Sequence, residues 1–337
     1  MLQILNKTPF ETGLSLYIDQ HGINRVCVAV KATFNIPKNN EKITLARKQL
    51  PVTTINEYYG EPGKSSIKYP TDIVLGKVST DIALNGKAYA PGKKPIDKLT
   101  TSLQIENLIK KIIVFGDRSW KKSIFDYSMT KPKLFTEMPI IYERAFGGID
   151  DTHKDIKMHG IYDKNPIGRG YCINKKNYQK IKLPNLENPD CLISSIKDIP
   201  DQPACYGCIE PVWGDNIKYS GTYNEDWRSN QFPLLPTDFN LRFFNIASSR
   251  LIADGLLKGG ETVKMENLSQ QGYLEFSLPE IKLNCIFRLG NEQIFTKPDI
   301  WTVLFEPDEK RFYMVWGTSC DVGKQPSRMK FVQVITD

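Results

Sequence analysis

Polar and hydrophobic positions alternate along the first third of the chain, which is the pattern of β-strands. The clearest run, RVCVAVKATF, covers residues 25–34 and places positions 26, 28, 30 and 32 on one face. A second alternating run covers residues 80–91, where Asn85 and Gly86 indicate a turn or bulge. Residues 99–106 and 111–115 predict a further pair of strands.

Strand patterns return in the last third of the chain. Residues 272–289 predict two strands joined near Pro279 and Glu280, and residues 299–317 predict a hairpin that turns at residues 307–310. Residues 329–335 supply a last strand. Between the middle and these strands, residues 248–257 (SSRLIADGLL) are expected to form a short helix with a serine cap.

The segment between these two β-rich parts has a different composition. Residues 119–240 contain ten of the 21 prolines and three of the five tryptophans. Long irregular segments are usually functional or disordered, and the aromatic content argues against disorder. We therefore expect a mainly β, sandwich-like fold with little helix, in which an N-terminal β part (1–118) and a C-terminal β part (241–337) pack together and flank a structured, loop-rich insertion (119–240).

Composition and charge narrow the class of protein. The chain has 337 residues, of which 40% are hydrophobic and 25% charged, as in ordinary globular proteins. Its net charge is +7, but lysine doublets such as Lys110–Lys111 are scattered among acids, which is typical of a solvated surface. A nucleic-acid partner would need a continuous basic stripe with interleaved aromatic residues, and none is expected here.

The start of the chain has no basic region followed by an apolar one, and no later window reaches about 18 uninterrupted apolar residues. These features predict a cytoplasmic protein without membrane insertion. The seven cysteines are odd in number and irregular in spacing, so reduced thiols are expected rather than a disulfide framework.

The sharpest chemical motif is Cys205-Tyr206-Gly207-Cys208, because two thiolates at this spacing can bind one zinc ion. A second pair of ligands at a known zinc spacing is missing from the sequence. Cys205 and Cys208 are therefore weak metal candidates, with redox-active thiols and buried thiols as the alternatives, and we expect no metal and no other cofactor.

Catalytic motifs are also incomplete. Gly63-Lys64-Ser65 resembles the end of a phosphate loop, but Tyr58 stands where its first glycine should be. Glu143, Asp226 and Asp238 lie among aromatic residues, as carboxylates do in glycosidases, although sequence cannot give their separation. No catalytic residue is predicted.

Polar and aromatic residues of the middle segment are the candidates for partner binding. Arginine and aromatic side chains are favoured anchors in interfaces. The candidates are Arg118, Trp120, Glu143, Arg144, Asn165 and Trp227. The competing interpretation is structural: in irregular loops such polar side chains commonly satisfy backbone groups, and tryptophans are commonly buried.

A series of motifs along the chain resembles a known family. The motifs run in order from the N-terminal to the C-terminal third: VKATF (30–34), EYYGEPGKSS (57–66), GDRSW (116–120), MPIIYERAFGG (138–148), NPIGRG (165–170), LPNLE (183–187), PLLPTDF (233–239) and GGE (259–261). They are similar to those of a bacterial domain-of-unknown-function family whose members accompany type VI secretion spike, PAAR-tip and effector proteins.

This resemblance implies a function that the residues alone do not. It implies a non-enzymatic adaptor or chaperone that binds a secreted effector in the cytoplasm and helps to load it onto the spike or PAAR-tip proteins. Two other classes remain open from the sequence: a metal-dependent or glycosidase-like enzyme, and a carbohydrate-binding β module that uses exposed tryptophan and tyrosine residues.

Overall fold

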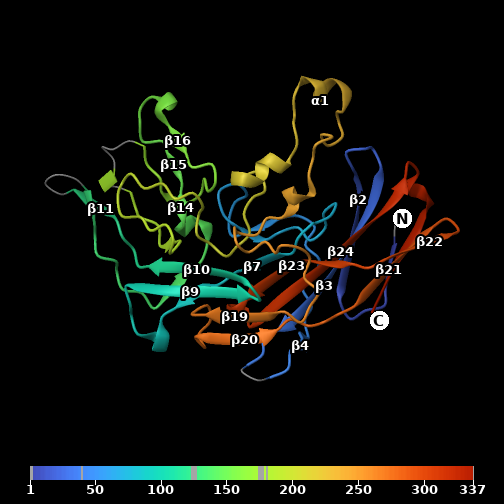
Figure 1. Cartoon of the computed structure of the whole chain (residues 1–337), viewed down its shortest axis with the longest axis horizontal. Helices are drawn as coiled ribbons and strands as arrows, with labels where there is room; N and C mark the ends of the chain where they lie inside the picture. The colour runs from blue at the N-terminus through green and yellow to red at the C-terminus, as the bar shows by residue number, and fades with distance from the viewer. Residues whose placement is uncertain (1–2, 39–40, 123–126, 174–177, 180, 337) are drawn as a thin grey trace.

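The structure is a computed structural model that describes residues 3–38, 41–122, 127–173, 178–179 and 181–336 (Figure 1). The chain is mainly β, with 41% of residues in strands and 11% in helices, which confirms the predicted fold class. The α-helix of the described chain, α1 (Glu225–Asn230), has six residues, and none of the described helices could span a bilayer.

Three larger sheets form the framework. The strands of the six-stranded sheet are, in order, β2 (Glu11–Ile18), β3 (Asn24–Asn35), β24 (Arg311–Gly323), β23 (Asp299–Glu306) and β7 (Asp81–Leu84), with β4 (Thr44–Leu45) paired to β3. The five-stranded sheet has the order β18 (Leu186–Glu187), β10 (Leu108–Phe115), β9 (Lys98–Ile105), β19 (Thr262–Glu266) and β20 (Tyr273–Ser277). The four-stranded sheet has the order β1 (Gln3–Asn6), β25 (Met329–Thr336), β21 (Leu283–Leu289) and β22 (Glu292–Thr296).

Shorter elements occupy the loops. Two-stranded pairs are β5 (Glu57–Tyr58) with β6 (Ile67–Tyr69), β8 (Lys87–Tyr89) with β13 (Glu137–Pro139), β11 (Trp120–Lys122) with β12 (Tyr127–Met129), β14 (Phe146–Gly147) with β17 (Arg169–Gly170), and β15 (Ile149–Asp150) with β16 (Gly160–Ile161). Single 3-10 turns or short 3-10 helices cover Pro91–Lys93, Tyr142–Arg144, Ile156–Met158, Gly214–Tyr219, Leu241–Phe244, Pro307–Glu309 and Pro326–Arg328.

Strands from the two ends of the chain pair with one another in all three sheets. β3 is antiparallel to β24 along most of its length, β7 is parallel to β23, β9 is antiparallel to β19, and β1 is parallel to β25. The middle segment therefore leaves and re-enters a framework whose sheets combine N-terminal and C-terminal strands.

Strand β3, an interior strand of the six-stranded sheet, is buried on both faces. Its even positions, from Val26 to Phe34, join the main hydrophobic core, to which all three larger sheets contribute side chains. Its odd positions include Cys27 and Ala29, which pack in a second core beneath the loops between residues 50 and 75. Burial of both faces explains why both sets of positions in this run are mostly apolar.

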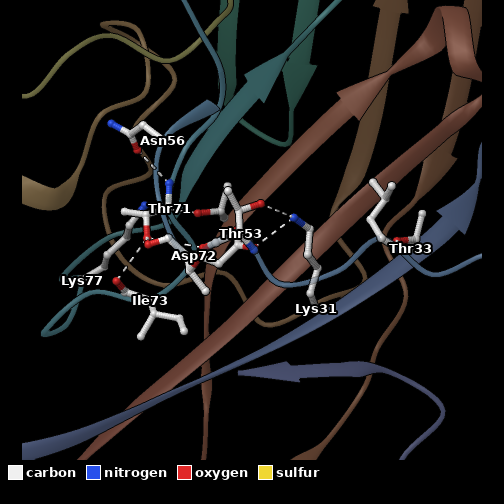
Figure 2. Close-up of polar contacts among 11 residues, drawn as sticks. Lys31, Thr33, Thr53, Asn56, Thr71, Asp72, Ile73 and Lys77 are labelled. Atoms are coloured by element: carbon white, nitrogen blue, oxygen red, sulfur yellow. Dashed lines mark hydrogen bonds and ion pairs between the residues drawn. The ribbon is translucent and has the colours of Figure 1, made fainter. Parts of the chain in front are cut away.

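A buried ion pair joins β3 to the loops that cover the second core (Figure 2). Lys31 projects from β3, and its Nζ lies 2.9 Å from Asp72 Oδ2 and 3.0 Å from Thr53 Oγ1. The same carboxylate oxygen accepts a hydrogen bond of 2.7 Å from the backbone N–H of Thr53. Lys31 Nζ also lies 4.1 Å from the centre of the Tyr313 ring. These contacts connect the loop to the sheet.

Most of the predicted strands are present, with adjusted ends. The run 25–34 is β3, the hairpin at 307–310 joins β23 and β24, and the break at Asn85 and Gly86 separates β7 from β8. Both strands predicted within 272–289 exist, as β20 and β21, but they belong to different sheets.

The predicted helix over residues 248–257 is wrong. This segment runs beside β7, where Leu251 O accepts a hydrogen bond from the N–H of Ile82 and the N–H of Ala253 donates to Thr80 O. The edge of β7 that does not pair with β23 offers backbone partners that a helix would forgo, and this non-local pairing overrides the local helix signal. The expectation of solvated lysine doublets is also wrong for Lys110, which is buried on β10 while Lys111 is exposed.

Candidate functional site

An arm formed by residues 221–236 projects from the sheets and carries α1 (Figure 1). Asn224 caps the helix, since its Oδ1 accepts a hydrogen bond of 2.9 Å from the backbone N–H of Trp227. Glu225 and Asp226 follow in the first turn, where negative side chains interact favourably with the positive end of the helix dipole. A six-residue helix is marginal alone, so its contacts with the rest of the arm must stabilise it.

Trp227 provides those contacts. Its Nε1 donates a hydrogen bond of 2.9 Å to Leu234 O, which joins the helix to the returning segment of the arm. The Tyr223 and Phe232 rings lie edge-on to it, at centroid distances of 4.7 and 5.6 Å. Tyr223 is 54% exposed and Phe232 67% exposed. The half-buried indole thus holds two exposed aromatic side chains in place.

The base of the arm is fixed to the body of the protein. Gln231 Nε2 donates to Gln20 O at 2.6 Å, in the turn that follows β2, and to Leu235 O at 2.9 Å. Asp238 accepts hydrogen bonds from the N–H and the hydroxyl of Thr222 across the base. The arm is therefore held at both of its ends.

An apolar pocket of about 430 Å³ lies between the arm and β2. Its lining is mostly aliphatic and aromatic and includes Tyr17, Ile18, Ile73, Leu234 and Phe244. Leu16 and Ile18 on β2 are also exposed large hydrophobic residues. We call the exposed aromatic residues of the arm, this pocket and the two β2 side chains the arm surface. Exposed apolar residues gathered beside an apolar pocket are typical of interaction sites.

Most of the motif residues predicted to bind a partner lie elsewhere, in internal networks. Glu143 accepts hydrogen bonds from the N–H (2.8 Å) and hydroxyl (2.5 Å) of Ser66. Asn165 is fully buried, and its Nδ2 donates to Tyr142 O at 2.9 Å and Phe146 O at 3.0 Å. Arg144 Nη1 donates to Asn185 Oδ1 at 3.0 Å. These side chains satisfy loop backbone and each other.

The motif glycines belong to the same network. Gly147 has φ of 152°, and a Cβ there would lie 2.1 Å from Asn165 O. The close approach of two loop backbones requires a residue without a side chain. This geometry accounts for the pairing of the AFGG and NPIGRG motifs in one folded unit, through β14 and β17.

Arg118 and Trp120 are also internal. Arg118 forms an ion pair with Glu187, donates to Pro184 O at 3.0 Å and stacks on the Phe115 ring at 3.7 Å. Trp120 is buried in a small core with Phe146 and Tyr162. Of the six predicted residues, Arg118, Trp120 and Asn165 are therefore buried, Glu143 and Arg144 are half-buried, and Trp227 alone lies on the arm, where it supports the arm surface.

The thiols of Cys205 and Cys208 are buried. The backbone N–H of Gly207 donates to Cys205 Sγ at 3.4 Å, and burial raises the pKa of the Cys205 thiol to about 12. Burial also raises the pKa of Cys208. Within the described ranges, no group of three or more His, Cys, Asp or Glu side chains is arranged to hold a metal ion.

Sequence reasoning overlooked Tyr223, Phe232, Leu16 and Ile18 as surface residues. A signal for the arm was present in the sequence. Asn224 is a preferred helix cap, Pro233 ends the short helical segment, and aromatic residues stand on both sides. Nothing local indicated that the helix would project rather than pack against the sheets.

The fold and the arm define a mainly β protein with three larger sheets, a loop-rich middle segment and a projecting aromatic arm. The profile of the family described as "Uncharacterized protein conserved in bacteria (DUF2169)" matches residues 21–317, and the chain belongs to this family. Comparison with curated proteins and with solved structures found no match. Membership of a bacterial family of unknown function is thus confirmed, and the association with type VI secretion stays a prediction.

Proposed function

We propose that this protein is an adaptor or chaperone that acts by binding rather than by catalysis. In this proposal it binds a type VI secretion effector in the cytoplasm and helps to deliver it to the spike or PAAR-tip proteins. The observation that carries the proposal is the arm, which presents exposed aromatic side chains on a support that is hydrogen-bonded to the body at its base.

The chemistry of the arm surface suits a protein partner. Interface hot spots are enriched in aromatic side chains held at low conformational cost, and Trp227 restricts the Tyr223 and Phe232 rings in this way. The neighbouring apolar pocket of about 430 Å³ can accept an aliphatic or aromatic side chain from the partner. A chaperone must cover apolar surface that its client exposes, so the contact should bury at least about 1,000 Å².

The test compares two phenylalanines with equal exposure. Phe232 on the arm and Phe295 on β22 are both 67% exposed. Each is replaced by alanine in the full chain, and binding to the effector encoded beside this protein is measured by calorimetry. Phe232→Ala should weaken binding at least about tenfold, as expected for a hot-spot residue, while Phe295→Ala should leave it unchanged.

Circular dichroism and thermal unfolding of both variants verify that folding is retained. Equal affinities for both variants would show that the arm is not the binding surface. In cells, deletion of the protein should lower the level or secretion of that effector while general secretion continues. Unchanged effector level and delivery, or specific binding to a glycan in place of the protein, would overturn the proposed function.

A further inference from the structure

A second pocket, of about 450 Å³, lies between the 3-10 helices Gly214–Tyr219 and Leu241–Phe244 and the segment that follows them. Tyr142, Asn245, Ser248 and Ser249 are among its lining residues, together with basic side chains that include Lys164 and Arg242. Asn245 is buried, and its Oδ1 has no hydrogen-bond partner among the described residues. Such an orphaned acceptor in a pocket lining is a polar group that a ligand could satisfy.

Ser248 in this pocket contacts a buried lysine. Lys110 Nζ lies 2.6 Å from Ser248 Oγ and 2.8 Å from Ser249 O. Tyr142, which lines the same pocket, donates through its hydroxyl to Gly207 O at 3.2 Å. Ser248 is 3% exposed, so only a small or tapered group could reach its hydroxyl. A serine hydroxyl within hydrogen-bonding distance of a lysine amine is the arrangement of nucleophile and base used for acyl transfer.

The surroundings of Lys110 favour its neutral form. Burial lowers the pKa of Lys110 to about 7, because the ammonium is removed from water. Two neighbouring groups have weaker effects on the pKa of Lys110. Cys205 raises this pKa, and Arg250 lowers it. Arg250 itself forms an ion pair with Asp190, in which Arg250 Nη1 lies 2.8 Å from Asp190 Oδ2. At neutral pH the Lys110 amine is therefore unprotonated in a substantial fraction of the molecules and can accept a proton.

We propose that Ser248 is a nucleophile activated by Lys110 and that it accepts the acyl group of a small carboxylic ester. The Ser248 hydroxyl transfers its proton to the neutral Lys110 amine, and Oγ forms a bond to the carbonyl carbon. The tetrahedral intermediate breaks the ester bond, and the leaving alcohol takes the proton from the Lys110 ammonium. Water then gives a proton to Lys110 and attacks the acyl-serine, and Ser248 Oγ departs with that proton as the acid is released.

This site is independent of the arm surface and goes beyond the proposed function. The pocket is formed by residues on either side of the arm in the chain, whereas Tyr223 and Phe232 belong to the arm itself. An acyl-transfer activity would add chemistry to a protein proposed to act by binding. Each property can be lost without the other, so separate variants distinguish them.

The test uses a fluorophosphonate probe on the full-length protein, followed by peptide mass spectrometry. Ser248 Oγ forms a bond to phosphorus, fluoride leaves, and Lys110 takes the hydroxyl proton. We expect label on Ser248 and a labelling rate that rises with pH with a midpoint near 7. Ser248→Ala should abolish this label, whereas the control Ser277→Ala, which changes an exposed serine on β20 outside the pocket lining, should retain it.

Lys110→Met tests the base. It should slow both labelling and hydrolysis of 4-nitrophenyl acetate at least about 100-fold. If this variant does not fold, the pH profile of the unmodified protein carries the test, because a midpoint above about 9 would exclude Lys110 as the base. Absence of label at Ser248 in the folded protein, or equal labelling of the Ser248→Ala variant, would overturn the proposal. Effector binding by Ser248→Ala should remain unchanged.

Discussion

Replacement of Lys31 by methionine should strongly destabilise the protein. The Lys31 and Asp72 side chains are 2% and 1% exposed, so the substitution leaves a carboxylate without its cation in a site that water does not reach. Methionine keeps most of the volume of the lysine side chain, and the effect is therefore electrostatic rather than a matter of packing. Asp72 retains the hydrogen bond from the N–H of Thr53, but its Oδ1 already has no partner among the described residues.

The expected loss is about 3 to 5 kcal/mol, the range found when one member of a buried ion pair is removed. The contact of Lys31 Nζ with the Tyr313 ring, at 4.1 Å, adds to this loss. The double variant Lys31→Met, Asp72→Asn removes both charges and retains a hydrogen-bond acceptor for Thr53. It should therefore be more stable than Lys31→Met alone, with a coupling energy of about 2 kcal/mol or more.

The dependence on pH has a definite sign. Burial raises the pKa of Asp72 even with Lys31 beside it, and Lys31 acts to lower that pKa. Without Lys31 the folded-state pKa rises further above the unfolded value, so the folded variant binds a proton more readily than the unfolded chain. The stability of the variant relative to wild type should then recover as the pH falls.

Guanidinium unfolding followed by tryptophan fluorescence measures these differences, with all variants at several pH values. A loss below about 1 kcal/mol in Lys31→Met, or single-variant effects that add in the double variant, would refute the assignment of Lys31 and Asp72 as a coupled buried pair. A gap between wild type and Lys31→Met that widens toward low pH would have the wrong sign.

Three further predictions concern other parts of the molecule. The folded-state pKa of Lys110, about 7, lies below that of an unfolded lysine, so unfolding takes up a proton above pH 7. The stability of wild type relative to Lys110→Met should therefore rise by about 2 kcal/mol from pH 7 to 9. A flat or falling difference in stability would contradict this. A thiol reagent should quickly modify one cysteine in the folded protein, the exposed Cys191, and all seven cysteines after unfolding. Elemental analysis should find no stoichiometric zinc, and replacement of both Cys205 and Cys208 by serine should leave folding intact. Zinc release with a stability loss of about 3 kcal/mol or more in that double variant would show a metal site instead. A fragment of residues 1–118 should show no sharp unfolding transition in calorimetry, because β3 and β9 lose their C-terminal partner strands. An independent cooperative transition would show that the N-terminal part is a domain.

Local pattern was sufficient for the strands. Local strand patterns located β3, β9, β23 and β25 close to their observed ends, because β-branched and aromatic residues favour extended backbone. The strand β24, predicted to end at residue 317, continues to Gly323. The Gly-rich and Pro-rich motifs of the middle segment likewise indicated ordered loops. The resemblance of those motifs to a bacterial family was confirmed by the family match.

Pairing partners were not encoded locally. The segment 248–257 has a helix pattern but pairs with β7, and β20 and β21 follow each other in sequence yet join different sheets. Backbone hydrogen bonds must be satisfied within the folded chain, and which edge is free for pairing depends on all the other strands.

The sequence by itself determined the mainly β class, the positions of the long strands, the irregular middle segment and the family. Only the tertiary structure decided which polar residues are buried and which aromatic residues are exposed. Lys31, Lys110 and Arg118 have the same local character as surface residues, but each has its polar partners brought to it from distant segments. Phe232, which composition alone would place in a core, is exposed because the arm carries it beyond the sheets. Burial depends on what the rest of the chain places around a side chain, and this information is not local.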